Sequence, residues 1–200
     1  MPGLFVTLEG IDRSGKTTQA RLLGEALGDR AVAVREPGGT AVGERVRELL
    51  KDPSIEVDER TEALLFAAAR AELVSEVIRP ALDEGKIVIS DRFLDSSLAY
   101  QGGARGLGVE EVERINEFAT GGLRPDVTVL LDLSPGAAAG RAGVEVDRFE
   151  QEGAGLQERV RAAYQELVVR DPDRWVRVDA DRDPDEVHRD VLAVVEGVLA

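Results

Sequence analysis

Several residue types that carry chemistry in other proteins are missing or scarce in this chain. It contains no cysteine, which excludes disulfides, thiolate metal ligands and thiol nucleophiles. The single histidine, His188, lies beside Glu186 and Arg189 in an amphipathic segment, so a Ser-His-Asp arrangement is not expected and His188 is interpreted as a solvated helix residue. The single tryptophan, Trp175, falls in an apolar run and is predicted to pack in the core or at a strand edge.

Positive charge is also scarce. The 39 acidic and 25 basic residues give a formal net charge of −14 at pH 7, so the protein as a whole would repel a nucleic acid polymer. An anionic ligand must therefore be small and held by local cations. Only three of the basic residues are lysines, Lys16, Lys51 and Lys86.

Long apolar runs are absent too. No stretch approaches the roughly 18 apolar residues that a membrane-spanning helix needs, and the segment after Met1 lacks the basic and long apolar regions of a signal peptide. We therefore expect a cytoplasmic protein that binds no membrane. At 200 residues the chain is predicted to form a single domain, residues 1–200.

Short apolar runs alternate along the chain with segments of helical periodicity. This alternation predicts an α/β fold in which helices cover a parallel sheet. Glycines 102, 103, 106 and 108 predict a surface loop, and the aperiodic segment 141–155 is a candidate mobile lid. The expected strands are 4–8, 31–34, 87–90, 127–133 and 175–178, and the expected helices are 17–27, 40–50, 58–80, 109–119, 156–169 and 184–199.

Residues 10–17 read GIDRSGKT and fit the pattern G-x-x-x-x-G-K-[ST] of a phosphate-binding loop. The pattern stands between an expected strand and an expected helix, which is the context that such a P-loop requires. Lys16 would neutralise the donor phosphates, and Thr17 would offer a hydroxyl to Mg²⁺. Ser14, Gly15 and Thr18 would contribute backbone N–H groups.

Three further charged residues are candidates for the same site. Arg13 could stabilise charge on a transferring group, although an exposed arginine at a loop tip is the alternative. Asp91 and Arg92 end an apolar strand, where parallel sheets place ligands, and could face a metal ion and a phosphate respectively. A surface ion pair is the alternative for this pair. Asp132 ends another strand, but the turn before Ser134 explains it equally well.

These motifs permit a nucleotide kinase, a GTPase or a noncatalytic nucleotide-binding module. A GTPase would be expected to carry a guanine-reading N-K-x-D sequence, and none is present. A regulatory module would not need Arg13, Asp91, Arg92 and Arg70 at two phosphate sites.

Segments outside the P-loop narrow the choice. In matching order across nearly the whole chain, the sequence resembles thymidylate kinases in GIDRSGKTTQ (10–19), REPGGT (35–40), LLFAAAR (64–70), ISDRF (89–93), SSLAYQGGARG (96–106), RPDVTVLLD (124–132) and DRFE (147–150). The resemblance implies a three-layer P-loop kinase fold with a five-stranded parallel sheet and a short lid. It also implies Mg²⁺-dependent transfer of the γ-phosphoryl group of ATP to dTMP, giving dTDP and ADP, by a homodimer. A kinase for another nucleotide or nucleoside is the nearest alternative.

The resemblance also implies roles for individual residues. Arg13, in the P-loop, would be the catalytic arginine because the lid is poor in arginines, and Lys16, Asp91 and Arg92 would complete the catalytic group, with Thr17 and Asp91 at the metal. The ATP-binding set would be Gly10, Ile11, Asp12, Arg13, Ser14, Gly15, Lys16, Thr17, Thr18 and the lid residue Arg141.

For the acceptor, Arg92 and Arg47 would hold the dTMP phosphate. Phe66 would stack on thymine and Arg70 would donate to a base carbonyl; a core Phe with an exposed Arg is the alternative. The remaining contacts would be Ser97 and Gln101 to the base, Tyr100 against the sugar 2′ position, Asp12 at the 3′-hydroxyl and Pro37 lining the base pocket. Phe93 and Ala104 depart from residues common in the family.

Overall fold

The chain folds around a five-stranded parallel sheet, as predicted. We describe it from a computed structural model, which covers residues 3–141 and 153–199. The sheet order is β2-β3-β1-β4-β5, so the strand before the P-loop is central. The strands are β1 (Leu4–Glu9), β2 (Ala31–Arg35), β3 (Ile87–Asp91), β4 (Val127–Asp132) and β5 (Trp175–Asp179), at the five expected places.

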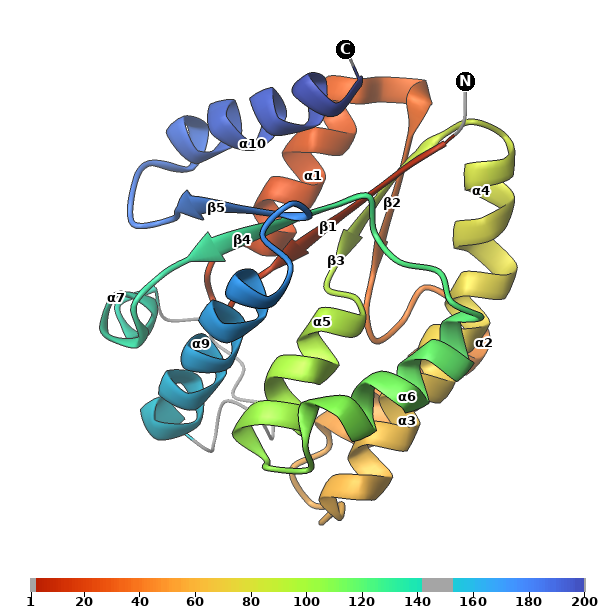
Figure 1. Cartoon of the computed structure of the whole chain (residues 1–200), viewed down its shortest axis with the longest axis vertical. Helices are drawn as coiled ribbons and strands as arrows, with labels where there is room; N and C mark the ends of the chain where they lie inside the picture. The colour runs from red at the N-terminus through yellow and green to blue at the C-terminus, as the bar shows by residue number, and fades with distance from the viewer. Residues whose placement is uncertain (1–2, 142–152, 200) are drawn as a thin grey trace.

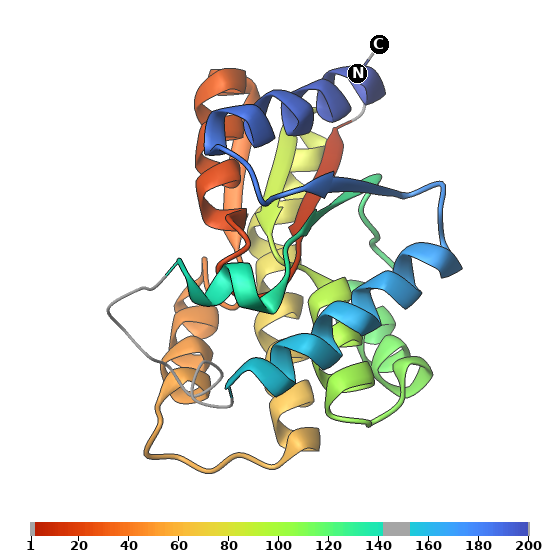
Figure 2. The same ribbon diagram turned by 90° about the vertical axis from the view of Figure 1, so that its left-hand side faces the viewer.

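Helices flank this sheet in two groups. The helices α1 (Lys16–Leu27) and α10 (Pro184–Leu199) pack on each other and on the strands, toward the top of Figure 1. The second group lies toward the bottom in Figures 1 and 2, where α3 packs on α2 and α6, and α9 packs on the segment 98–104. Its members are α2 (Ala41–Lys51), α3 (Glu59–Leu73), α5 (Leu94–Ser97), α6 (Val109–Thr120) and α9 (Gly153–Arg170).

The expected helix 58–80 forms, but not as one regular helix. Asp58 caps α3, because its side chain accepts hydrogen bonds from the N–H groups of Arg60 and Thr61. A π-helical turn, η2 (Val74–Ile78), then leads into α4 (Arg79–Asp83). Pro80 lies in the first turn of α4, where its missing N–H costs little, so the chain stays helical beyond the expected end.

The predicted glycine loop at 102–108 is wrong in its first half. Residues Leu98–Ala104 form a second π-helical turn, η3, directly after α5, and Gly102 is buried. A Cβ atom on Gly103 would lie 2.6 Å from Cβ of Ala163 in α9. The glycines here permit close helix packing, whereas Gly106 and Gly108, with positive φ, do form the turn before α6.

The buried strands and the inner helix faces form one continuous apolar core. Trp175 is 5% exposed, and its ring packs edge to face against that of Tyr164 with the ring centroids 6.3 Å apart, as expected for core packing. His188 lies in α10 as expected but is only partly exposed, and no described residue forms a hydrogen bond with its buried Nδ1.

Within 3–141 and 153–199, no helix is long and apolar enough to cross a membrane. Most of the expected lid, residues 142–152, lies outside the described residues, and 153–155 begin α9. The short helix α7 (Pro135–Ala139) precedes this part of the chain. The single-domain organisation, the cytoplasmic location and the lid stay predictions.

Candidate active site

The P-loop connects the central strand β1 to α1 and folds around its own lysine. A Cβ atom on Gly10, whose φ is +142°, would lie 2.6 Å from the carbonyl oxygen of Leu131, so only glycine fits here. Lys16 Nζ donates to the carbonyl oxygens of Gly10 at 3.1 Å and Ile11 at 2.7 Å, and to Ser14 Oγ at 3.3 Å. The ammonium group is therefore held beneath the loop by neutral oxygens.

This environment makes Lys16 an unusually acidic lysine. Burial of the ammonium group and the nearby Arg92 guanidinium lower its pKa from 10.5 to about 8, although Asp91, Asp12 and Glu9 counteract the shift. A bound polyphosphate would supply the negative charge that favours the protonated lysine.

The two residues expected at a metal ion lie together. Parallel pairing aligns Leu8 of β1 with Asp91 of β3, which brings the ends of both strands to one edge of the sheet. There the Thr17 hydroxyl donates to Asp91 Oδ2 at 2.5 Å. A hydroxyl and a carboxylate are hard oxygen ligands of the kind that Mg²⁺ takes together with substrate phosphates, so the residues fit this ion.

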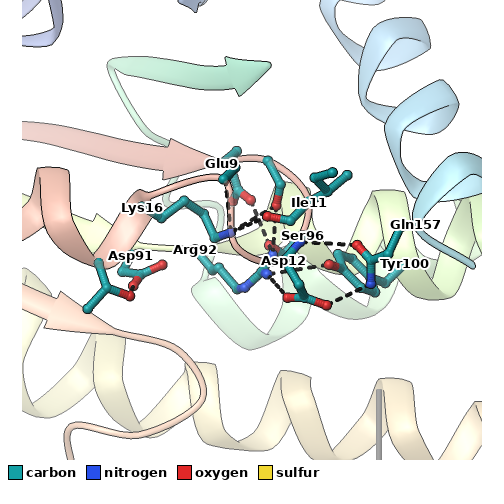
Figure 3. Close-up of polar contacts among 12 residues, drawn as sticks. Glu9, Ile11, Asp12, Lys16, Asp91, Arg92, Ser96, Tyr100 and Gln157 are labelled. Atoms are coloured by element: carbon teal, nitrogen blue, oxygen red, sulfur yellow. Dashed lines mark hydrogen bonds and ion pairs between the residues drawn. The ribbon is translucent and has the colours of Figure 1, made fainter. Parts of the chain in front are cut away.

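Arg92 is held by a network of oxygens at the same edge. Its Nη1 donates to the Gly10 carbonyl oxygen at 3.2 Å and to Ser96 Oγ at 3.1 Å, and its Nη2 lies 2.5 Å from Asp12 Oδ1 (Figure 3). The guanidinium also lies 5.1 Å from the ring centroid of Tyr100. The pair that forms is thus Arg92 with Asp12, not the surface pair of Asp91 with Arg92 considered above.

Arg13 and Arg92 share an uncommon backbone conformation. Their φ angles are +64° and +72°, and no other non-glycine residue of the described chain has positive φ. Non-glycine residues at positive φ are strained, and such strain is concentrated at functional sites.

Asp12 connects the P-loop to α9. Gln157 accepts from the Asp12 N–H at 3.1 Å, and its Nε2 donates to Asp12 Oδ2 at 2.7 Å. Burial would raise the pKa of the Asp12 carboxyl, but Arg92 and Lys16 outweigh this effect and keep the pKa below its usual value.

Arg70 is buried and bonded on every side. Its Nε donates to Glu36 Oε2 at 2.8 Å, and further bonds run to Ser97 Oγ at 3.1 Å, to the Phe93 carbonyl oxygen at 3.0 Å and to Asn116 Oδ1. Burial raises the pKa of Glu36 to about 7 despite the opposing charge of Arg70. The alternative of an exposed Arg70 is therefore wrong.

Two cavities meet at the P-loop, and Arg13, Lys16 and Thr17 line both. The first, here called the acceptor cavity, has a volume of about 330 Å³. It is lined by Asp12, Arg13, Lys16, Thr17, Arg35, Glu36, Pro37, Arg47, Leu50, Lys51, Phe66, Asp91, Arg92, Ser96, Ser97, Tyr100 and Gln101. The second, the donor cavity, has a volume of about 590 Å³ and is lined by Arg13, Ser14, Gly15, Lys16, Thr17, Thr18, Gln19, Arg141, Ala180, Arg182, Pro184 and Val187.

Most of the expected nucleotide-binding residues line one of these cavities. Gly10 and Ile11 do not, because their carbonyl oxygens bind Lys16 instead. Arg70 does not line the acceptor cavity either, since the network described above holds it behind the wall. Asp132 pairs with Arg161 at 2.8 Å and lies in neither cavity, which leaves no reason to place it at a metal.

Several residues that the fold brings to the site were not predicted from the sequence. Arg35, Glu36, Lys51 and Ser96 line the acceptor cavity. Arg182 lines the donor cavity, and Gln157 reaches Asp12 from a distant helix. Glu9 lines neither cavity but lies next to the P-loop. Its position in the sequence could have revealed it, because it is an acid at the end of an apolar strand. Arg35, Glu36 and Ser96 lie in the segments 35–40 and 96–106 quoted above. Lys51, Arg182 and Gln157 had no such signal, because their place at the site depends on which elements pack together.

A family model described as thymidylate kinase matches residues 8–191. The chain belongs to the thymidylate kinase family. A thymidylate kinase of Thermoanaerobacter sp. (strain X514) is 48% identical, with all of both chains covered. The thymidylate kinase of Symbiobacterium thermophilum is 51% identical over 98% of this chain and 94% of that protein. That of Deinococcus radiodurans is 46% identical over 96% of each chain.

Membership of the thymidylate kinase family agrees with the resemblance stated above and with the fold. The P-loop strand is central in the sheet, and the segments 10–19 and 89–93, which carry part of the resemblance, meet at the carboxyl ends of β1 and β3.

Proposed function

We propose that this protein transfers the γ-phosphoryl group of ATP to dTMP, giving dTDP and ADP for dTTP synthesis. The single observation that carries the proposal is the junction of the two cavities, because Arg13, Lys16 and Thr17 line both. A donor phosphate and an acceptor phosphate bound in the two cavities would meet over these residues. The name of the relatives, thymidylate kinase, supports the choice of acceptor.

The chemistry needs charge neutralisation more than a base. The second pKa of a phosphate monoester is near 6, so the acceptor oxygen is largely ionised at neutral pH. In the proposed mechanism Lys16 neutralises the donor phosphates, Arg92 holds the acceptor phosphate, and Arg13 stabilises charge on the transferring group. Arg141 lines the donor cavity and would add a contact to ATP.

The acceptor cavity also has groups suited to a deoxynucleoside. Phe66 of α3 offers an aromatic face for a base. Ser97 of α5 and Gln101 of η3 offer polar contacts. Gln101 Nε2 donates to the buried Glu62 at 2.9 Å, a bond that fixes the orientation of the carboxamide. Tyr100 and Asp12 would lie at the sugar, Arg47 beside the phosphate and Pro37 along the base.

Thr17 and Asp91 would hold Mg²⁺. When bound, this ion would neutralise phosphate charge and orient the donor phosphates. Removal of divalent cations with EDTA should abolish turnover, and added Mg²⁺ should restore it.

The first test is an assay of the purified protein with Mg·ATP against dTMP, dUMP, dCMP, dGMP, CMP and thymidine, measuring ADP and the phosphorylated product. We expect strong preference for dTMP. Preference for another acceptor would support a kinase of different specificity. If no acceptor raised ADP release above the rate with ATP alone, the proposed kinase activity would be wrong and ATP binding would be measured to test a noncatalytic module.

We also propose that the protein is a homodimer. The large apolar side chains Leu64 of α3 and Phe118 of α6 are 56% and 92% exposed, on two helices that pack side by side. Sedimentation equilibrium would give the mass of a dimer, and Phe118→Asp would weaken it if this surface forms the interface.

A further inference from the structure

Glu9 is a buried acid at the active site that lines neither cavity. It is the last residue of β1, directly before the P-loop, and its side chain is fully buried. Its Oε1 accepts from the Phe93 N–H at 2.8 Å, and its Oε2 accepts from the hydroxyls of Ser96 at 2.6 Å and Tyr164 at 2.7 Å. A buried carboxyl is costly unless its oxygens are bonded, and here both are.

Ser96 connects this acid to Arg92. The Ser96 hydroxyl donates its one proton to Glu9 Oε2, so its lone pairs are left for the Arg92 Nη1–H, 3.1 Å away. Figure 3 shows Glu9, Ser96 and Arg92 in this order, with Arg92 continuing to Asp12. The acid thus sets the direction of the hydroxyl dipole that the guanidinium meets.

Glu9 also fixes the backbone beside Arg92. Arg92 has φ of +72°, and its N–H donates to the Leu8 carbonyl oxygen at 3.0 Å. The next N–H, that of Phe93, donates to Glu9. The last two residues of β1 therefore hold the strained turn on both sides of the Arg92 α-carbon.

We propose that Glu9 is a positioning residue that fixes the guanidinium of Arg92 for the acceptor phosphate. The proposal deepens the proposed function and rests on it. Two independent connections carry it, one through the Ser96 hydroxyl and one through the Phe93 N–H. Tyr164 of α9 adds a third support from the far side of the acid.

The variant Glu9→Gln tests this role because it keeps the volume and removes one acceptor. The new NH₂ group must face either the Phe93 N–H or the two hydroxyls, so at least one connection is lost or reversed. Loss of a hydrogen bond to a charged group costs about 1.4 kcal/mol or more, so KM for dTMP should rise about tenfold, with KM for ATP within about twofold. Ser96→Ala, which cuts only the hydroxyl connection, should raise KM for dTMP in the same direction.

Thr7→Val is the matched control. Thr7 lies on the same strand and its hydroxyl donates to Thr128 Oγ1 at 2.9 Å in the buried interior, away from both cavities. It should lower the melting temperature without changing KM for dTMP. A general loss of packing would affect this control and Glu9→Gln alike.

A double-mutant cycle separates positioning from a structural role. If Glu9 acts through Arg92, the effect of Glu9→Gln on kcat/KM for dTMP should largely disappear in an Arg92→Ala background. An undiminished effect in that background, or an unchanged KM for dTMP in a folded Glu9→Gln protein, would overturn the proposal.

A readout without turnover keeps the inference testable if dTMP is not the substrate. The ¹⁵N-edited NMR signal of the Arg92 guanidinium, assigned with Arg92→Lys, should be sharp in the unmodified protein and broadened or shifted in Glu9→Gln. Failure of the dTMP assay with this NMR change would overturn the proposed function alone. An unchanged Arg92 signal in Glu9→Gln would overturn the positioning role whatever the substrate.

Discussion

The two cavities differ in how their cations are held before a ligand binds. On the acceptor side, Arg92 is partly buried and paired with Asp12, and Arg70, which is fully buried behind the cavity wall, is paired with Glu36. On the donor side, Arg141 is exposed and donates to backbone carbonyl oxygens, among them that of Ala180 at 2.5 Å. The acceptor cavity is arranged by the fold, whereas the donor cavity offers groups that a polyphosphate would organise.

This difference has a physical consequence for binding and catalysis. Groups fixed by buried networks lose little entropy when a ligand arrives, so they favour specificity for one acceptor. Exposed arginines and the P-loop backbone suit a polyphosphate, which every nucleoside triphosphate carries. We therefore expect substitutions in the acceptor cavity to alter the constants for dTMP, and substitutions in the donor cavity to alter those for ATP.

The largest effect is expected from Arg13→Ala at the junction of the cavities. An arginine that stabilises the transferring phosphoryl group contributes about 10³-fold or more to kcat, so kcat should fall by that factor while KM for ATP changes little. Steady-state kinetics would measure it. Arg21→Ala, on the exposed surface of α1, is the control and should leave kcat unchanged. A kcat within threefold of the unmodified enzyme would remove Arg13 from the proposed mechanism.

The second largest effect is expected from Arg92→Ala, which should impair use of dTMP but not of ATP. Removing the guanidinium takes a cation away from the acceptor phosphate and leaves the partly buried Asp12 carboxylate without this partner, so kcat/KM for dTMP should fall about 100-fold, with KM for ATP nearly unchanged. Arg92→Lys should recover little activity, because an ammonium group cannot replace the forked contacts to Asp12 and Ser96. An equal loss of affinity for ATP would contradict the assignment of Arg92 to the acceptor side.

A pH dependence is expected on the donor side. Lys16 has a pKa of about 8 in the free protein, and bound phosphates should raise it, so ATP binding should take up protons near pH 8 and above. Linkage then predicts that ATP binding weakens about tenfold from pH 7 to pH 9. Calorimetry in buffers of different ionisation enthalpy would measure the uptake. The variant Lys16→Arg should take up no proton through this side chain when ATP binds. Proton release by the unmodified protein would contradict the expected rise in the Lys16 pKa.

The smallest effect is expected from Tyr100→Phe. The Tyr100 hydroxyl makes a long hydrogen bond of 3.3 Å to Arg92 Nη2 and also contacts the Asp12 carboxyl, which keeps its bonds to Arg92 and Gln157 in the variant, and the ring beneath the guanidinium stays. KM for dTMP should therefore change by less than about threefold. Tyr100→Ala, which removes the ring as well, is the comparison, and equal effects of both variants would show that the hydroxyl matters more than the ring.

Local sequence patterns predicted much of the fold. The five strands formed where short apolar runs occur, and the helix expected from residue 58 begins there, with Asp58 as its N-cap. The π-helical turn over Leu98–Ala104 was missed, because Gly102 and Gly103 resemble loop residues in the sequence. Glycine is needed at these two positions because the backbone packs closely against Val109 and Ala163, a contact that no local sequence pattern reveals.

The sequence by itself determined the P-loop, since the positive φ of Gly10 and the bonds of Lys16 to the carbonyl oxygens of Gly10 and Ile11 lie within one turn. The sequence also placed Asp91 and Arg92 at the carboxyl end of a strand, where β3 ends in the structure. Only the tertiary structure decided the partners: Arg92 met Asp12 and not Asp91, and Arg70 turned into a buried network with Glu36. Sheet order decided the first pairing, because β1 and β3 are far apart in the chain but end side by side. The packing of α3 beside the sheet decided the second, and burial requires each charge there to find a partner.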